Sequence, residues 1–214
     1  MKIKWYGHSC FLMTAGNGAR FLTDPCDPGV GYTLKHIETD VVTVSHGHHD
    51  HNYLDAVMGN PEVLAEEGAW EILGCRIHAV PTFHDEVGGK KRGSNLVFVF
   101  EIDGLTVAHL GDLGHLPSAE TIEAIGHVDV LLVPIGGVYT IDADEARKVA
   151  NLLTPKVLIP MHYKTRACTL DIDGVDRLLT GARNCRIHRV GESEATLTLP
   201  ALGEDRILVF EYAK

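Results

Sequence analysis

The order of strand-like and helix-like segments is the feature that most constrains the fold of this 214-residue chain. In the first half, short apolar or alternating segments are separated by turns, and Asp103-Gly104 between the last two is a strong hairpin signal. In the second half, helical patterns at 118–125 and 143–153 precede buried-type strands at 128–133 and 156–160. This succession predicts two sheets faced by helices, a layered α/β sandwich. The other expected strands are 2–6, 10–14, 20–23, 41–45, 76–81, 95–102, 106–110, 186–190, 195–199 and 207–212, with short helices at 53–58 and 175–179.

Length and charge narrow the class of protein. A chain of this size can bury a large core, and with no evident linker it is expected to form one domain, residues 1–214. With 45% hydrophobic and 22% charged residues, the composition is that of an ordinary globular protein. The net charge of −10 argues against broad electrostatic binding of nucleic acid and favours a small-molecule substrate.

The amino terminus and the cysteines favour a cytoplasmic location. Residues 1–8 enter a strand pattern at once and lack the apolar core of a signal peptide, and no apolar run is long enough to span a bilayer. The five cysteines are odd in number and scattered without CxxC spacing, which suits reduced thiols that fill the core. A homo-oligomer remains open, and no membrane insertion is expected.

The segment 45–51, with the sequence SHGHHDH, is the strongest chemical signal in the chain. Imidazoles and carboxylates are ligands of first-row metals, and alternate positions can direct His46 and His48 to one ion while Asp50 and His51 face another. A histidine-rich tract can also be a tag or a loose metal scavenger. This tract is internal and follows an apolar strand, where α/β folds place their chemistry, so it predicts a metal site.

Further metal ligands are expected at the ends of other strands. His84 follows one strand, Asp112 lies in the glycine-containing segment 111–115, and His162 follows another strand. Taken singly, each of these residues is more often a turn or capping residue than a ligand.

The order and spacing of these residues resemble the metallo-β-lactamase superfamily. Its HxHxDH signature is matched by His46, His48, Asp50 and His51, and the later motifs are matched in order by the residues named above, within 1–165. Segments 7–9, 23–25, 111–115 and 160–163 resemble the small metal-dependent hydrolases related to L-ascorbate 6-phosphate lactonase. The resemblance implies a four-layer αββα sandwich and a hydrolase, but it is poor at naming a substrate.

The resemblance also implies a ligand set for two divalent ions per chain. His46, His48 and His84 would hold the first ion, Asp50, His51 and His162 the second, and Asp112 would bridge them. The nitrogen and oxygen donors suit zinc, with manganese and iron as alternatives. The oxygen-reducing di-iron relatives typically carry an acidic residue where this chain has His48.

Two ions at about 3.5 to 4 Å would favour hydrolysis, because a shared water then loses its proton near neutral pH. Esters, lactones and phosphodiesters are all candidate substrates of such a metal-bridged hydroxide. The alternatives are an RNA-processing phosphodiesterase or nuclease, an iron-dependent redox enzyme on the same fold, and a noncatalytic member, against which the full ligand set argues.

Other polar residues have weaker functional interpretations. His115 could protonate a leaving group, or it could be a surface histidine ahead of a helix. Asp24 is expected to orient the His46 loop from behind rather than to bind metal. His8 and Ser9 could approach the site, but a role in a strand-end turn is favoured for both. The basic loop 86–94 could meet an anionic group or be a solvated hairpin loop, and loop 134–140 could line the pocket.

Overall fold

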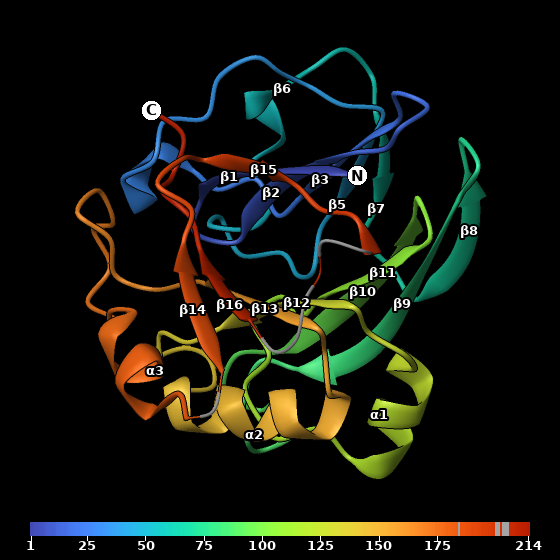
Figure 1. Cartoon of the computed structure of the whole chain (residues 1–214). Coiled ribbons are helices and arrows are strands. Elements are labelled where there is room, and N and C mark those ends of the chain that lie inside the picture. The colour runs from blue at the N-terminus through green and yellow to red at the C-terminus, as the bar shows by residue number, and fades with distance from the viewer. Residues whose placement is uncertain (184, 200–201, 203–205) are drawn as a thin grey trace.

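A mixed six-stranded sheet forms one half of the sandwich, in the order β15-β1-β2-β3-β5-β7 (Figure 1). The computed structural model describes residues 1–183, 185–199, 202 and 206–214. Strands β15, β1, β2 and β3 pair antiparallel, whereas β3, β5 and β7 pair parallel. The strands are β1 (Lys2–Gly7), β2 (Cys10–Thr14), β3 (Arg20–Thr23), β5 (Val41–Thr43), β7 (Glu62–Leu64) and β15 (Glu194–Thr196).

The second sheet has eight strands in the order β14-β16-β13-β12-β11-β10-β9-β8. Strands β8, β9, β10 and β11 form an antiparallel meander. The remaining neighbours pair parallel, in the order β11, β12, β13, β16 and β14. The parallel steps need crossovers, which α1 (Ala119–Ile125) and α2 (Ala143–Leu153) supply. The strands are β8 (Gly68–Ile72), β9 (Cys75–Phe83), β10 (Ser94–Ile102), β11 (Leu105–His109), β12 (Val130–Pro134), β13 (Val157–Met161), β14 (Arg186–Arg189) and β16 (Arg206–Val209).

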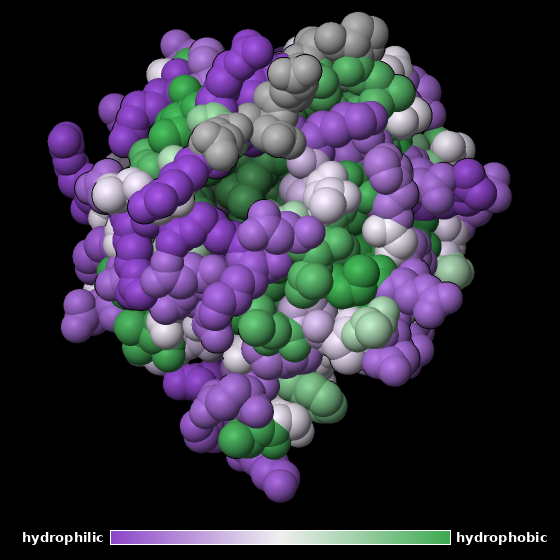
Figure 2. Space-filling model, turned by 60° about the horizontal axis from the view of Figure 1, so that its bottom comes forward, coloured by the Kyte–Doolittle hydropathy of each residue, from purple (hydrophilic) through white to green (hydrophobic). Residues whose placement is uncertain are grey.

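The helices cover the outer face of the eight-stranded sheet, together with α3 (Asp176–Gly181) (Figure 1). Helix α2 begins at a capping box, in which Asp142 accepts from the backbone N–H of Glu145 and Glu145 accepts from that of Asp142. Its buried residues follow helical spacing: Ala143, Ala146, Val149 and Leu153. The exposed side of this layer is mainly hydrophilic with separate hydrophobic patches (Figure 2).

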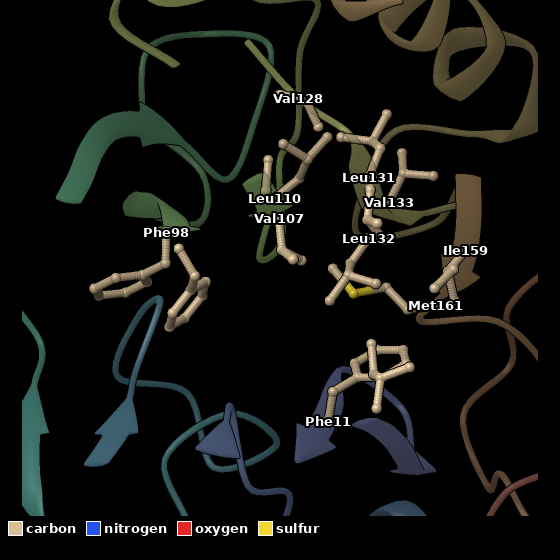
Figure 3. Close-up of a cluster of buried hydrophobic side chains, with 14 of the residues drawn as sticks. Phe11, Phe98, Val107, Leu110, Val128, Leu131, Leu132, Val133, Ile159 and Met161 are labelled. Carbon is tan, nitrogen blue, oxygen red and sulfur yellow. The ribbon is translucent and has the colours of Figure 1, made fainter. Parts of the chain in front are cut away.

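The main core lies between the sheets and continues under the helices. Figure 3 shows Phe11 of β2 facing Leu132 and Met161 of the second sheet, with Leu131 and Val133 on the opposite side of β12. Strand β12 is thus buried on both faces, which explains its continuous apolar sequence. Each fully buried side chain of this size contributes roughly 1.5 to 3 kcal/mol of hydrophobic stabilisation.

A smaller core covers the outer face of the six-stranded sheet. Leu22 and Val42 point into it, whereas their neighbours Phe21 and Val41 point into the main core. The covering elements are the 3-10 turns η1 (Pro28–Val30) and η2 (Leu54–Ala56) and the paired strands β4 (Ile37–Glu38) and β6 (Val57–Met58). Across the described part of the chain, no α-helix lies in this layer. Buried thiols also help to fill this core: Cys10, Cys26 and Cys168.

The prediction of a helix at 53–58 is wrong. Its first half is the single turn η2, and Val57 is extended (φ −101°, ψ 141°) and pairs with Ile37. A six-residue segment with a β-branched residue near its end is too short to form a stable helix, so strand pairing prevails. The expected α/β sandwich is confirmed, and the helices described are all too short or too polar to cross a membrane.

Candidate metal centre

The histidines and carboxylates of the centre lie just beyond the ends of strands from both sheets. His8 follows β1, the loop 45–51 follows β5, and His84, Asp112 and His162 follow strands of the eight-stranded sheet. Backbone hydrogen bonds tie these loops together. Leu96 N–H donates to the Ser45 carbonyl (2.9 Å), and His162 N–H donates to the His8 carbonyl (3.1 Å).

Three groups of donor atoms converge there. Within each group, one donor atom from every residue lies within 4.8 Å of the others. The first group unites His46, His48 and His84. The second group consists of His8, Asp50, His51 and His162. The third group joins His46 and His51 to Asp112. The seven residues expected as ligands are therefore brought together, and His8 is added to them.

Asp112 lies at the middle of the cluster. Its Oδ1 is 3.0 Å from Nε2 of His51, and its Oδ2 is 3.2 Å from Nε2 of His84 and 3.3 Å from Nε2 of His162. The two oxygens therefore face members of both histidine groups. This is the placement that a bridging carboxylate requires.

The hydrogen bonding of the cluster fits a bound cation. Among the described residues, both oxygens of Asp112, Nε2 of His46 and His51, and both ring nitrogens of His162 are buried without a hydrogen-bond partner. Some of these atoms lie within ion-pair distance of each other, but they are not oriented as hydrogen bonds. Burying so many unpaired polar atoms is unfavourable, and a divalent ion would satisfy them together.

Asp24 supports this cluster from behind. One of its oxygens accepts from Ser45 N–H (2.7 Å), and the other accepts from Ser45 Oγ (2.6 Å) and lies 2.7 Å from Nδ1 of His51. The side chain is fully buried, and its backbone is in the left-handed region (φ 38°). The bond to Nδ1 leaves Nε2 of His51 facing Asp112, as the outer hydrogen bond of a metal-binding histidine does.

Burial and charge set the protonation of the cluster in opposite ways. Burial lowers the pKa of His46 to about 3, with His51 adding to the shift, and burial also lowers the pKa of His48. Burial opposes protonation of His51 too, but the carboxylates of Asp112 and Asp24 raise its pKa well above the usual value. His46 and His48 are thus neutral and ready to bind a cation, whereas the two carboxylates favour a proton on His51.

Two glycines permit the close packing of the loops. A Cβ on Gly114 would lie 2.3 Å from the backbone carbon of His84, and a Cβ on Gly136 would lie 2.5 Å from the carbonyl oxygen of His162. A side chain at either position would displace a candidate ligand.

The basic loop after His84 is ordered around Asp85. Its carboxylate accepts four backbone N–H bonds, from Val87, Gly89, Lys91 and Arg92, at 2.8 to 2.9 Å. Although burial acts against it, these bonds lower the pKa of Asp85 to about 2. The Arg92 guanidinium then donates to the Val138 carbonyl (3.2 Å) and lies 5.7 Å from the centre of the Tyr139 ring. The two loops beside the site are therefore joined.

His115 lies outside the three donor groups. Its Nε2 accepts from Phe83 N–H (3.2 Å), and its Nδ1 lies 2.9 Å from the Leu116 carbonyl. Both ring nitrogens are thus occupied by backbone groups. This position argues against the expected proton transfer and favours a role in holding the loop.

His8 is the site residue that the sequence interpretation underrated. It does form a strand-end turn (φ 51°), but its side chain is fully buried and its Nε2 lies 3.3 Å from Oδ2 of Asp50. His8 and Asp50 are 42 residues apart in the sequence, and no local motif indicates that His8 lies beside the histidine-rich loop. The buried His109, by contrast, bonds the Ser9 carbonyl (2.8 Å) and belongs to the support of the loops.

Comparison with known proteins extends these observations. Residues 2–162 match the family model described as Beta-lactamase superfamily domain. A UPF0173 metal-dependent hydrolase of Nanoarchaeum equitans is 34% identical over 190 residues, covering 77% of this chain and 85% of the relative. A UPF0173 metal-dependent hydrolase of Thermoplasma acidophilum is 31% identical over 191 residues, covering 77% and 84%.

A solved structure is similar over almost its whole length. It is a proposed Zn-dependent hydrolase of the metallo-beta-lactamase superfamily from Thermotoga maritima, with 41% identity, a TM-score of 0.81 and 97% of both chains covered. These comparisons confirm the broad resemblance and the fold. They give no support to the narrower likeness to L-ascorbate 6-phosphate lactonase.

Proposed function

The chain belongs to the metallo-β-lactamase superfamily and, within it, to the UPF0173 metal-dependent hydrolase family, and from this premise we propose that it is a dinuclear metal-dependent hydrolase of a small substrate. The observation that carries the proposal is the convergence of two histidine-containing groups on the buried Asp112 carboxylate. Histidines with a purely structural role would not need to converge on a shared buried carboxylate.

The proposed ligands follow the two groups. His46, His48 and His84 would hold one divalent ion, Asp50, His51 and His162 would hold the other, and the Asp112 carboxylate faces histidines of both sets. Divalent ions held by these residues would supply Lewis acidity and would lower the pKa of a bound water toward neutrality. The protein supplies the fixed positions: Asp24 orients His51, and the Asp85-centred loop fixes the path of the chain after His84.

Zinc is the proposed ion. Imidazole and carboxylate donors suit it, and the similar protein from Thermotoga maritima is described as a proposed zinc-dependent hydrolase. Manganese and iron are the alternatives, because the same donors bind them. An iron-loaded, coloured protein would favour the redox alternative over hydrolysis.

The proposed substrate is a small ester, lactone or phosphodiester in the cytoplasm. The net charge of −10 disfavours the nuclease alternative, because a nucleic acid needs a broad basic surface. A sugar-derived lactone of the ascorbate 6-phosphate type is one member of this group. The proposal therefore specifies the reaction, metal-dependent hydrolysis, more closely than it specifies the substrate.

Elemental analysis combined with a panel of lactone, ester and phosphodiester substrates tests the proposal. Two equivalents of zinc per chain and hydrolysis of at least one substrate class are expected. The exposed His49 stands between candidate ligands without joining a donor group, so His49→Ala is the matched control and should keep both properties. A metal-replete protein that binds no ion tightly would contradict the proposal.

A further inference from the structure

The turn after β1 holds the His8 side chain inside the metal centre. Gly7 has φ 114°, and a Cβ there would lie 2.2 Å from the Tyr32 ring, so this position is closed to other residues. The His8 carbonyl accepts from Trp5 Nε1 (3.0 Å) and from His162 N–H (3.1 Å). These bonds fix the backbone on both sides and leave the imidazole directed toward the cluster.

The imidazole of His8 packs against the second donor group. Its ring centre lies 4.0 Å from that of His162 and 5.2 Å from that of His51. The side chain is fully buried, and the backbone of His8 is in the left-handed region (φ 51°), a conformation that residues other than glycine retain mainly where the surroundings demand it. The surrounding structure therefore holds His8 in a fixed position within the centre.

The distance between His8 and Asp50 helps to distinguish an outer hydrogen-bonding partner from a ligand. Hydrogen bonds between a charged group and its partner are usually about 2.7 to 2.9 Å long, whereas Nε2 of His8 lies 3.3 Å from Oδ2 of Asp50. Two neighbouring donors on one zinc ion, each about 2.0 to 2.1 Å from it, are about 2.9 to 3.6 Å apart in a four- or five-coordinate site. The observed distance matches the separation of two ligands better than a strong hydrogen bond.

We propose that His8 is a direct ligand of the second ion, beside Asp50, His51 and His162. The inference rests on the proposed function, because it assigns a further residue to the same dinuclear centre. It gives the second ion four protein ligands besides Asp112, against three for the first ion. The second position is then the more strongly held of the two.

Anomalous scattering from zinc-replete crystals of the full chain tests the assignment directly. A zinc ion about 2.0 to 2.1 Å from a ring nitrogen of His8 is the expected result. An ion held by Asp50, His51 and His162 but more than about 3 Å from both nitrogens of His8 would overturn it, leaving His8 as an outer support of Asp50.

Zinc titration against a competing chelator gives a second readout that does not depend on activity. In His8→Ala, one of the two ions should bind at least about 100-fold more weakly, the upper end of the loss caused by removing an outer partner. His49→Ala should leave both affinities unchanged. Unchanged binding of both ions in His8→Ala would defeat this inference alone, whereas a wild-type chain that binds none would defeat the proposed function as well. The crystallographic test needs no variant and stands even if His8→Ala does not fold.

Discussion

Nδ1 of His51 lies 2.7 Å from Oδ2 of Asp24, a carboxylate outside the candidate ligand set. The same carboxylate binds the backbone and hydroxyl of Ser45, so it fixes both the start and the end of the histidine-rich loop. A histidine held this way presents its other nitrogen in one orientation. Asp24 therefore fixes the orientation of His51 within the candidate centre.

Asp24→Asn tests this positioning. The amide retains the size of the carboxylate but removes the charge that holds His51, so zinc affinity should fall about 10- to 100-fold, as for other outer partners of metal ligands. Chelator competition measures the change. Asp129→Asn is the matched control, because Asp129 is equally buried but pairs with Lys156 and Thr106. Equal losses in both variants would indicate a general effect of burial.

Zinc binding should release a proton from His51. Its pKa is raised by Asp112 and Asp24 against the opposing effect of burial, so above pH 6.5 and below the raised value the folded metal-free protein holds a proton that the unfolded chain has lost. A ligand must be neutral, so zinc binding should tighten as pH rises through this window. The folding stability of the metal-free protein should change in the opposite direction. The stabilisation contributed by protonated His51 is lost as pH rises through its raised pKa.

Calorimetry in two buffers of different protonation enthalpy measures the released protons. Deprotonation of bound water adds to the count, but it is common to the wild type and Asp24→Asn. The variant lowers the pKa of His51, so it should release fewer protons near neutral pH. Identical release from both proteins would show that His51 is already neutral.

The sequence predicted the two-sheet sandwich and the histidine-rich loop of the candidate centre because their signals are local. Residues 45–51 lie together in the chain, and apolar alternation marked the long strands. The strands β4 and β6 have only two residues each and carry no period, so 53–58 could be mistaken for a helix. His8 joins the cluster through tertiary packing across both sheets, and the backbone partners of His115 likewise depend on how the loops meet.

Asp112→Ala should abolish most hydrolytic activity while leaving the fold largely intact. The carboxylate lies between the two histidine groups and has no hydrogen-bond partner among the described side chains, so it contributes little to the main core. Activity, zinc content and circular dichroism should be measured on the same sample. Full activity in the variant would rule out the bridging role.

His115→Gln separates proton transfer from support of the loop. A glutamine amide can accept from Phe83 N–H and donate to the Leu116 carbonyl, but it cannot act as a general acid. We expect this variant to keep activity within a few-fold and zinc content unchanged, with His115→Ala more impaired. A loss of about 10²- to 10⁴-fold in kcat in both variants, largest for poor leaving groups, would restore the general-acid role.

Gly136→Ala should disturb the second ion through His162. The added Cβ would lie 2.5 Å from the His162 carbonyl oxygen and 3.2 Å from its Nδ1, so the backbone that carries the ligand must shift. A misplaced ligand weakens binding even when its chemistry is unchanged, so we expect loss of about one zinc equivalent with near-native circular dichroism. Gly47→Ala is the matched control, because it lies within the histidine-rich loop and its Cβ would meet nothing within 4 Å. Two tightly bound ions in Gly136→Ala would show that His162 is not needed where the donor group places it.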